Sequence, residues 1–330
     1  MTGGAGYIGS TICSALEDAG HTPVVLDSLY RGRREFTTGR IFYEADVADR
    51  ATLNTIVADH PEIGCTVHCA ARIVVPESVL DPSSYWRENV SKTLQLCDNL
   101  AAVGLARIVY SSSASLYALT ERFEVSEDDP LAPSSPYART KQAVEMLLAD
   151  LCGGTDLRAI VLRYFNPVGA DPLFRTGPYE AEGSHVLGQL VATAEGQRPW
   201  FTLTGTDHPT PDGTGVRDYV HVWDLARAHV AAVERFDHVL GLADKPIDVI
   251  NLGTGSGTSV RELVTMFERA LGRSIPVHEA PARPGDAVGG YANADKAARV
   301  LDWRTELTVQ EGIASALAWA RRRSVVLGAR

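Results

Sequence analysis

The sequence predicts an α/β protein in which a doubly wound parallel sheet is followed by a smaller mixed α/β domain. Three observations predict it. Strand-like and helix-like segments alternate from residue 23 to residue 162, a pattern that places helices on both faces of a parallel sheet. A glycine-rich loop opens the chain, and the alternation stops after Arg163, where segments rich in Pro, Gly and Asp begin. We therefore expect one domain over residues 1–165 and a second mainly over residues 166–330, with some chain crossing back to the sheet.

The opening stretch, Thr2–Gly9, carries glycines at positions 3, 6 and 9. Without a Cβ the backbone turns tightly and lets a ligand approach. An apolar helical pattern runs from there to Gly20, so that helix would aim its N-terminal N–H groups at a pyrophosphate. A strand-like run over residues 23–26 ends in Asp27, near the ~20-residue offset of a ribose-binding acid. A plain tight turn also fits three glycines, but the combination predicts a Rossmann-type dinucleotide site.

Only Met1 precedes this loop in the sequence. In a dinucleotide-binding fold, a buried strand at the centre of the sheet leads into the glycine loop. We therefore expect the first strand to be truncated, with the natural start some residues upstream.

The remaining elements follow from hydrophobic periodicity and capping signals. Strands are expected at residues 41–43, 66–69, 108–110 and 159–162, and helices at residues 51–58, 81–103 and from 136 onward. Later helices are expected at about Val186–Ala194, Trp223–Arg235, Val260–Leu271, Asp295–Leu301 and Val309–Arg321. Capping boxes begin two of these helices, at residues 259–262 and 308–311. The long loops at residues 166–183 and 205–215 are expected to be functional or disordered.

Composition and charge exclude several classes of protein. A chain of 330 residues is long enough to bury one large core or two smaller ones. Its composition, 45% hydrophobic and 22% charged, is that of an ordinary globular protein. The net charge of −10 and the lack of a basic stripe argue against a nucleic-acid partner. No apolar run approaches the ~20 residues of a membrane helix, and no signal peptide precedes the loop. We expect a cytoplasmic protein with no membrane partner.

The five cysteines are scattered along the chain. Cys65 and Cys69 fall on an expected strand among apolar residues, which favours buried reduced thiols over metal ligands. We therefore predict no metal site.

A tyrosine and a lysine share one face of the helix that begins at Pro136. Tyr137 and Lys141 are four residues apart, so the phenol and the ammonium can meet at one ligand. A nearby cation is expected to pull the tyrosine pKa down from ~10 toward working pH, which suits a general base. Ser113, at the end of the preceding strand, would steer a substrate oxygen. The plain alternatives are a packed tyrosine, a solvated lysine and a turn serine.

Several motifs occur in one order along the chain. They are the loop Thr2–Gly9, the serines 111–113, Tyr137-x-x-x-Lys141, Arg163-Tyr-Phe-Asn-Pro167, Gly213-Thr-Gly-Val-Arg-Asp-Tyr-Val-His221, Asn251-Leu-Gly-Thr-Gly255 and Arg283-Pro-Gly-Asp286. Together they closely resemble the UDP-glucose 4-epimerases of the extended short-chain dehydrogenase/reductase family. The resemblance runs from Thr2 to about Trp303. The Tyr-Phe-Asn-Pro and Gly-x-Arg-Asp-Tyr segments are its most specific parts.

The resemblance implies roles for individual residues. The catalytic residues would be Ser113, Tyr137 and Lys141. The NAD-binding residues would be Gly3, Gly6, Tyr7, Ile8, Gly9, Asp27, Asp46, Val47, Ala70, Ala71, Asn89, Ser111, Tyr137, Lys141 and Tyr164. The residues for the UDP-sugar would be Ser113, Tyr137, Asn166, His185, Arg217, Arg283, Asp286 and Gly290. The carboxylate of Asp27 favours NAD over NADP, because it repels a 2′-phosphate.

The reaction implied is reversible C4 epimerisation of a UDP-hexose through a 4-keto intermediate, with NAD bound throughout. A homodimer is implied as well, through the helices at residues 82–103 and 136–152. Their apolar residues (Leu94, Leu100, Val144 and Leu148) fit either that interface or the core of one chain. Anchoring energy is expected on the UDP part, remote from the chemistry.

Three positions depart from the resembled pattern. Ile73 stands where a lysine commonly reaches the phosphates, and Arg72 is the neighbouring substitute. His185 stands where an asparagine usually touches UDP. Gly290 stands where a tyrosine restricts the pocket, so we hypothesise that UDP-GlcNAc and UDP-GalNAc are also substrates.

Three other functions are alternatives to this one. A 4,6-dehydratase is disfavoured, because Ala114 and Ser115 stand where that class places Asp-Glu. An epimerase for UDP-glucuronate or a UDP-pentose stays open, since it would differ in few pocket contacts. A non-catalytic NAD(H)-binding regulator is disfavoured by the presence of both Tyr137 and Lys141.

Overall fold

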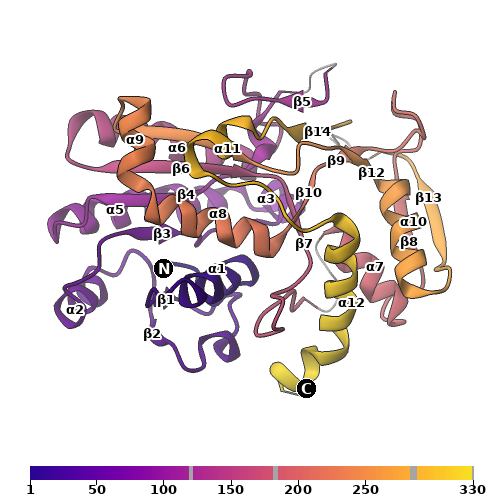
Figure 1. The fold of residues 1–330 in the computed structure, drawn as a ribbon, viewed down its shortest axis with the longest axis horizontal. Helices are drawn as coiled ribbons and strands as arrows, with labels where there is room; N and C mark the ends of the chain where they lie inside the picture. The colour runs from indigo at the N-terminus through magenta and orange to yellow at the C-terminus, as the bar shows by residue number, and fades with distance from the viewer. Residues whose placement is uncertain (119–121, 181–184, 283–287, 329–330) are drawn as a thin grey trace.

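The structure is a computed structural model that describes residues 1–118, 122–180, 185–282 and 288–328 (Figure 1). Its main sheet is parallel, as predicted. The strands are β1 (Val24–Asp27), β2 (Ile41–Glu44), β3 (Thr66–His68), β4 (Arg107–Ser111), β6 (Arg158–Tyr164) and β11 (Ile247–Leu252). β2 pairs with β1, and the others follow in the order β3-β4-β6-β11. Thr2 joins the two parts through parallel bridges to Leu26 in β1 and His68 in β3.

Helices cover both faces of this sheet, which confirms the predicted fold class. Side chains alternate between the faces along each strand. On β6, Ile160 and Leu162 pack in the core with α1 (Tyr7–Asp18) and α8 (Val222–Glu234). Ala159 and Val161 pack on the opposite face with α5 (Lys92–Ala102) and α6 (Pro136–Gly154). The helix α2 (Arg50–Asp59) covers the β1 end, where Ile56 meets Val24 and Leu26.

The segment expected as one helix over residues 81–103 contains a change of helix type. It runs through α4 (Pro82–Tyr85), a π-helical turn (Trp86–Ser91) and α5. The Asp81 side chain caps its start by accepting the backbone N–H of Ser84 at 3.1 Å. π-Helical turns are frequent at functional sites, and this one carries Asn89. The short helix α3 (Val75–Leu80) before it was not predicted.

The apolar residues considered for a dimer interface divide into two groups. Leu100, Val144 and Leu148 are buried in the core between α5, α6 and the sheet. Leu94 is exposed, and so are Trp86 and Met146 on the same group of helices. Only the second group is available to a partner.

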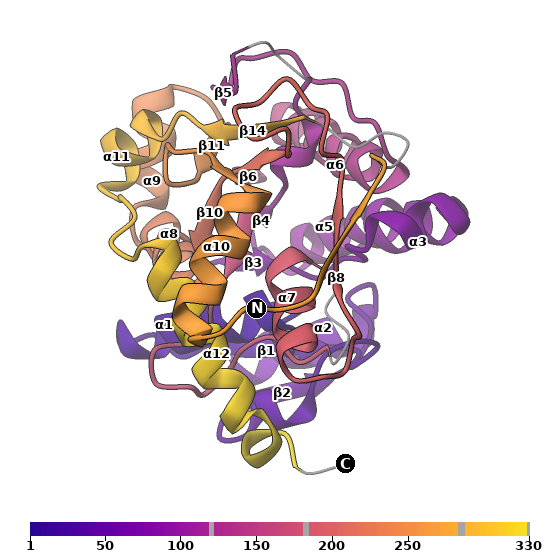
Figure 2. The same cartoon turned by 90° about the vertical axis from the view of Figure 1, so that its right-hand side faces the viewer.

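A second core is built from the later part of the chain (Figure 2). The helices α7 (Val186–Ala194), α10 (Val260–Leu271) and α12 (Val309–Val326) pack with β8 (Phe201–Thr204), which pairs in parallel with β13 (Val277–Ala280). Both predicted capping boxes are present, at the starts of α10 and α12. The predicted helix at residues 295–301 is α11 (Asp295–Leu301), and α9 (Phe236–Ala243) was not predicted. Among the described residues, none of the helices combines the length and the apolar composition of a membrane span.

Very short strands connect the two cores. The order β12-β9-β14-β5 joins Thr258–Ser259, Val216–Arg217, Gly289–Ala292 and Glu124–Val125. β7 (Asn166–Val168) pairs in parallel with β10 (Tyr219–His221). The buried carboxylate of Asp218 holds this region together, because it accepts the backbone N–H groups of Thr254, Gly255 and Ala292. Two 3₁₀ turns, Arg34–Thr37 and Ala114–Leu116, complete the list of elements in the described residues.

Candidate active site

The glycine loop has the geometry that two of its glycines require. Gly3 adopts a φ of 69°, and a Cβ there would lie 2.6 Å from the backbone N of Ala70. A Cβ on Gly9 would lie 2.1 Å from the carbonyl oxygen of Gly3. The loop runs into α1, whose N-cap residue Gly6 contributes no side-chain hydrogen bond. The first-turn N–H groups of α1 are therefore left for an anionic ligand.

Asp27 stands at the carboxyl end of β1 beside this loop. Its side chain is buried, with Oδ2 accepting the Ala5 N–H at 3.0 Å and Oδ1 accepting the Leu29 N–H at 2.8 Å. Burial raises the pKa of this carboxyl, while the two backbone hydrogen bonds oppose that rise. Each carboxylate oxygen has more than one acceptor site, so Asp27 can also bind ribose hydroxyls.

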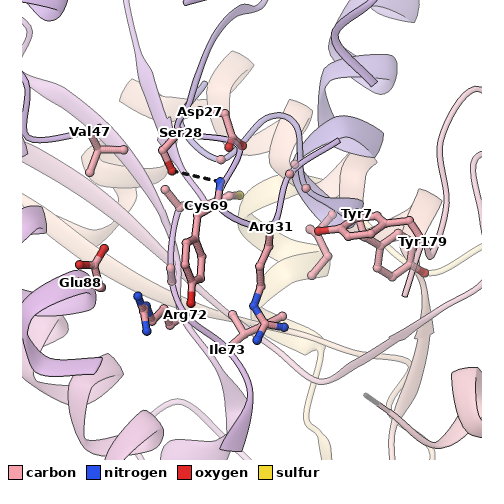
Figure 3. A pocket seen from close by; sticks show the side chains of 18 of the residues that line it. Tyr7, Asp27, Ser28, Arg31, Val47, Cys69, Arg72, Ile73, Glu88 and Tyr179 are labelled. Carbon is pink, nitrogen blue, oxygen red and sulfur yellow. Dashed lines mark hydrogen bonds between the residues drawn. The ribbon is translucent and has the colours of Figure 1, made fainter. Parts of the chain in front are cut away.

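A cavity of about 220 Å³ lies over the loop and Asp27 (Figure 3). It gathers many of the residues predicted for NAD and one predicted for the UDP-sugar. These are Gly3, Gly6, Tyr7, Ile8, Gly9, Asp27, Asp46, Val47, Ala70, Ala71, Tyr164 and His185. Arg72 and Ile73, named above among the departures from the resembled pattern, also line it. The lining residues that were not predicted are Ser28, Tyr30, Arg31, Gly32, Cys69, Glu88, Lys92, Pro178, Tyr179, Glu180 and Gly188. The long loop at residues 166–183, expected to be functional or disordered, contributes three of them, Pro178, Tyr179 and Glu180.

Ion pairs connect the walls of the cavity. Arg31 donates to Glu180 at 3.0 Å and also to Glu77 in α3. Lys92 donates to Asp46 at 2.5 Å and to Glu88 at 2.7 Å. The pair of Arg31 with Glu180 brings a segment of the second half of the chain against the cofactor side of the first.

The catalytic candidates lie at the carboxyl end of β4 and the start of α6. The Tyr137 side chain is hydrogen bonded to Ser113, which also caps the turn at residues 114–116 by accepting the Ser115 N–H at 3.2 Å. Ser113 therefore combines the turn role with the predicted contact to Tyr137. Lys141 is buried one helical turn farther on, where its Nζ donates to the Ser111 carbonyl at 2.8 Å.

The pKa values of this pair differ from the expectation. Burial raises the pKa of Tyr137 to about 12, although the hydrogen bond to Ser113 lowers it. Burial also lowers the pKa of Lys141 to about 8. The expected lowering of the tyrosine pKa by Lys141 is thus not found, because the ammonium is directed at the Ser111 carbonyl and the ring of Tyr110, 4.8 Å away.

Ser111 links the catalytic group to the cavity. Its Oγ lies 2.7 Å from Cys69 Sγ and 3.1 Å from His229 Nε2, and it is hydrogen bonded to Tyr164. His229 Nδ1 lies 2.8 Å from the Leu225 carbonyl, so that nitrogen carries the proton and Nε2 accepts from Ser111. Cys69 and Tyr164 line the cavity. The Lys141 site therefore adjoins the dinucleotide pocket through one residue.

A buried ion pair stiffens the same strand ends. Arg163 donates to Glu145 through Nε at 3.0 Å and Nη2 at 2.6 Å, and Ser112 donates to the same carboxylate at 2.5 Å. Both charged side chains are less than a tenth exposed. The pair fixes α6 against β4 and β6, next to Tyr137.

Asn89 does not line the cavity, although it was predicted to contact NAD. Its Oδ1 accepts the Arg72 N–H at 2.7 Å, and its Nδ2 donates to the Arg72 carbonyl and to Thr140 Oγ1, each at 3.0 Å. The amide is thus engaged by the protein, and a direct contact with NAD stays a prediction.

Three residues predicted for the substrate come together around the short strands. Gly290 stands opposite Arg217 in the pairing of β14 with β9, and Asn166 donates its N–H to the Asp218 carbonyl at 3.0 Å. His185 lies in the cavity, where its Nδ1 accepts the Gly188 N–H at 3.2 Å and burial lowers its pKa. The predicted residues Arg283 and Asp286 lie outside the described residues.

The glycine loop, the buried acid and the Tyr-x-x-x-Lys pair define a dinucleotide-binding α/β protein. The sequence profile of the NAD dependent epimerase/dehydratase family matches residues 1–253. The chain belongs to this family, and NAD is its cofactor.

Relatives and solved structures extend the match over nearly the whole chain. A UDP-glucose 4-epimerase of Rhizobium leguminosarum bv. trifolii is 42% identical, with 97% of this chain and 96% of that one covered. A UDP-glucose 4-epimerase from Stenotrophomonas maltophila, solved with NAD and formylated UDP-arabinopyranose, has a TM-score of 0.92 and 36% identity, covering 98% of both chains. That from Bifidobacterium longum, solved with NAD⁺ and UDP, has a TM-score of 0.88 and 34% identity, covering 97% of both chains. The prediction of an epimerase-like enzyme is confirmed.

Proposed function

We propose that the protein catalyses reversible C4 epimerisation of a UDP-hexose, interconverting UDP-glucose and UDP-galactose. The observation that carries the proposal is the hydrogen-bonded pair of Ser113 and Tyr137, one helical turn from Lys141 and adjoining the dinucleotide cavity. The similarity to enzymes named UDP-glucose 4-epimerase over nearly the full length supports it. Residues 1–165 would then hold mainly the cofactor and residues 166–330 mainly the UDP-sugar.

In the proposed mechanism, Tyr137 accepts the proton of the sugar 4-hydroxyl and later returns it on the other face. When bound, NAD supplies the acceptor and donor of the C4 hydride. Ser113 positions the 4-oxygen through its hydroxyl. Lys141, whose Nζ donates to the Ser111 carbonyl one helical turn from Tyr137, would bind the cofactor there.

The sugar must turn between the two hydride transfers, so the binding energy belongs on the UDP part. Asn166 stands on β7, which pairs with β10, and Arg217 stands on β9, two residues before β10. Both are proposed to hold the UDP part, together with Arg283 and Asp286. His185 is proposed to donate from Nε2, because Nδ1 already accepts a backbone N–H. Its lowered pKa keeps it neutral at physiological pH.

Replacing Tyr137 tests the catalytic role. Tyr137→Phe removes the proton acceptor and keeps the ring, so turnover should fall at least ~100-fold while the bound NAD is retained. Epimerase rate and NAD content after denaturation are measured together, with Tyr43→Phe as the control. Unchanged turnover in Tyr137→Phe would favour a non-catalytic regulator instead.

The range of UDP-sugars that the enzyme accepts is proposed to depend on Gly290. We propose that UDP-GlcNAc and UDP-GalNAc are also substrates, because glycine leaves space beside Arg217. A Cβ at this position would lie 3.2 Å from the Phe123 carbonyl oxygen, so a larger side chain is tolerated only with small shifts. Gly290→Tyr should lower turnover of UDP-GlcNAc at least tenfold more than that of UDP-glucose. Gly290→Ala controls for the shift, and a wild-type UDP-GlcNAc rate more than a hundredfold below that for UDP-glucose would contradict the proposal.

The alternative is a 4-epimerase for UDP-glucuronate or a UDP-pentose. The Stenotrophomonas enzyme was solved with a formylated UDP-pentose, so a UDP-pentose is tested as a separate substrate. Purified protein is incubated separately with UDP-glucose, UDP-GlcNAc, UDP-glucuronate and UDP-xylose, and the products are resolved by chromatography. Fastest conversion of an acid or a pentose would replace UDP-glucose as the proposed substrate.

A cytoplasmic homodimer is part of the same proposal. The exposed apolar side chains of Trp86, Leu94 and Met146 on α5, α6 and the π-helical turn support a partner surface there. Sedimentation of the wild type and of Leu94→Asp measures it, and an equal monomer mass for both would contradict it.

A further inference from the structure

Three successive serines at the end of β4, at positions 111–113, each contact one residue of α6. Tyr137, Lys141 and Glu145 follow one another at intervals of four residues, so their side chains lie along one face of that helix. Tyr137 is hydrogen bonded to the third serine, Lys141 donates to the carbonyl of the first, and Glu145 accepts the hydroxyl of the second. The contact of Glu145 is the one that the proposed mechanism does not use.

The hydrogen bond from Ser112 to Glu145 is buried and short. Ser112 is 0% exposed, and its Oγ donates to Glu145 Oε1 at 2.5 Å. Its backbone N–H donates to the Leu162 carbonyl of β6 at 2.8 Å. A hydrogen bond to a carboxylate is charge-assisted and is stronger than one between neutral groups. Ser112 is therefore held by its side chain as well as by its backbone.

The carboxylate that accepts this bond is itself fixed by Arg163 on β6. The Nε and Nη2 of Arg163 donate to Glu145, and Nη1 donates to the Tyr117 hydroxyl at 3.0 Å. Tyr117 in turn donates to Asn251 Oδ1 on β11 at 2.6 Å. Glu145 is thus carried by α6 and tied to two strands of the sheet, which makes it a rigid point of attachment for the serine segment.

Ser113 follows directly, and its hydroxyl has two neighbours that compete for it. One is Tyr137, to which it is hydrogen bonded. The other is Ser115, whose Oγ lies 2.9 Å from Ser113 Oγ and whose N–H donates to the same oxygen at 3.2 Å. A small rotation of Ser113 toward Ser115 would remove its hydroxyl from Tyr137. The direction of Ser113 depends on the residue before it, because the two share a peptide bond.

We propose that Ser112, held by Glu145, is a positioning residue that keeps the Ser113 hydroxyl within hydrogen-bonding distance of Tyr137. The proposal rests on the proposed function, in which Ser113 and Tyr137 act on the sugar 4-hydroxyl. Ser112 and Glu145 do not line the cavity that the described residues form, so they act through Ser113 rather than on a ligand. A small displacement is enough, because a misplacement of ~1 Å can lower the rate ~100-fold.

The test separates positioning from stability in the full-length holoenzyme. Ser112→Ala removes the hydroxyl, and Ser112→Cys keeps a similar shape but donates only weakly. Each is compared with the wild type, and Ser112→Ala is also combined with Ser113→Ala. Ser14→Ala on α1 is the matched control, because Ser14 is also 0% exposed and its Oγ accepts a charged donor, Arg40, at 2.8 Å. The values measured are kcat, KM, NAD content and Tm, with the UDP-sugar that the wild type converts fastest.

We expect Ser112→Ala and Ser112→Cys to lower kcat about tenfold, with KM and NAD content at their wild-type values. In the Ser113→Ala background, Ser112→Ala should lower kcat less than ~twofold, because no hydroxyl is left to position. Ser14→Ala should lower Tm to a similar extent as Ser112→Ala and leave kcat unchanged. The difference between these two variants distinguishes positioning from a general loss of stability.

Crystal structures of the wild type and of Ser112→Ala report the place of Ser113 without any turnover. The Ser113 hydroxyl should contact Tyr137 in the wild type and be turned toward Ser115 in the variant. An unchanged contact with Tyr137, or a tenfold loss of kcat that persists in the Ser113→Ala background, would overturn the proposal. Either result leaves the proposed epimerase function standing, since product formation by the wild type measures that. A wild type that converts no UDP-sugar would instead contradict the proposed function, and the two structures would still decide whether Ser112 positions Ser113.

Discussion

Lys141 should destabilise the fold that it serves, and its removal tests this. The side chain is buried, and burial lowers its pKa from 10.5 to about 8. At 1.36 kcal/mol for each pH unit, this difference means that the ammonium lowers the free energy of unfolding by about 3 kcal/mol at pH 7. Lys141→Met keeps a similar shape without the charge. We therefore expect the variant to be inactive and more stable.

The size of the effect follows from the length of the chain. An unfolding entropy of ~2.1 cal/mol/K per residue gives roughly 0.7 kcal/mol/K for the whole protein. A gain of about 3 kcal/mol then corresponds to a rise in Tm of about 4–5 °C.

The sign of the pH dependence distinguishes the cost of burying the Lys141 charge from a change in packing at that position. The unfolded chain binds the Lys141 proton more tightly than the folded chain does. Between pH 8 and 10.5 the wild type should therefore gain stability relative to Lys141→Met, by up to ~1.36 kcal/mol per pH unit. Above pH 10.5 the difference should vanish.

Chemical denaturation of both proteins at pH 7, 8, 9, 10 and 11 measures these differences, with NAD content determined for each sample. A variant that is less stable than the wild type at pH 7 would refute the reasoning. So would a difference that stays constant from pH 8 to 10.5.

Two further substitutions test the walls of the site. Gly9→Ala would place a Cβ 2.1 Å from the Gly3 carbonyl oxygen, so the loop must shift and the purified protein should lose most of its NAD. Gly153→Ala is the control, because a Cβ there meets open space. Equal NAD content in the two variants would contradict the loop geometry. Arg163→Met leaves the Glu145 carboxylate buried without its partner and should lower the free energy of unfolding by about 3–5 kcal/mol. The exposed pair of Arg107 with Asp237 is the comparison, because Arg107→Met should change stability by less than ~1 kcal/mol; equal Tm shifts would show that burial of the pair has no special effect.

The parts of the fold that were predicted have local causes. The bounds of α7 match the expectation, because its apolar periodicity begins and ends within the same nine residues. The capping boxes place the starts of α10 and α12 for a similarly local reason. The short strands β5, β9 and β12 carry no such pattern, since each forms only by pairing with a segment far away in the sequence. Asp218, beside β9, accepts the N–H groups of Thr254 and Ala292, which lie 36 and 74 residues away.

The candidate site also contains features that local sequence predicts and features that depend on contacts between distant segments. The glycine loop and Asp27 were predicted, because backbone geometry and offset in the sequence determine them. The contact between Arg31 and Glu180 spans 149 residues and was not predictable. The direction of the Tyr137 pKa was wrong, because it depends on burial and on the Ser111 carbonyl that takes up the Lys141 ammonium.

The central claim is that one hydride leaves C4 of the sugar and returns to the same carbon. UDP-glucose carrying deuterium at C4 is incubated in ordinary water with the purified protein, and the UDP-galactose formed is analysed by mass and NMR. The account predicts UDP-galactose with the deuterium retained at C4. UDP-galactose with hydrogen at C4, or no UDP-galactose at all, would contradict it.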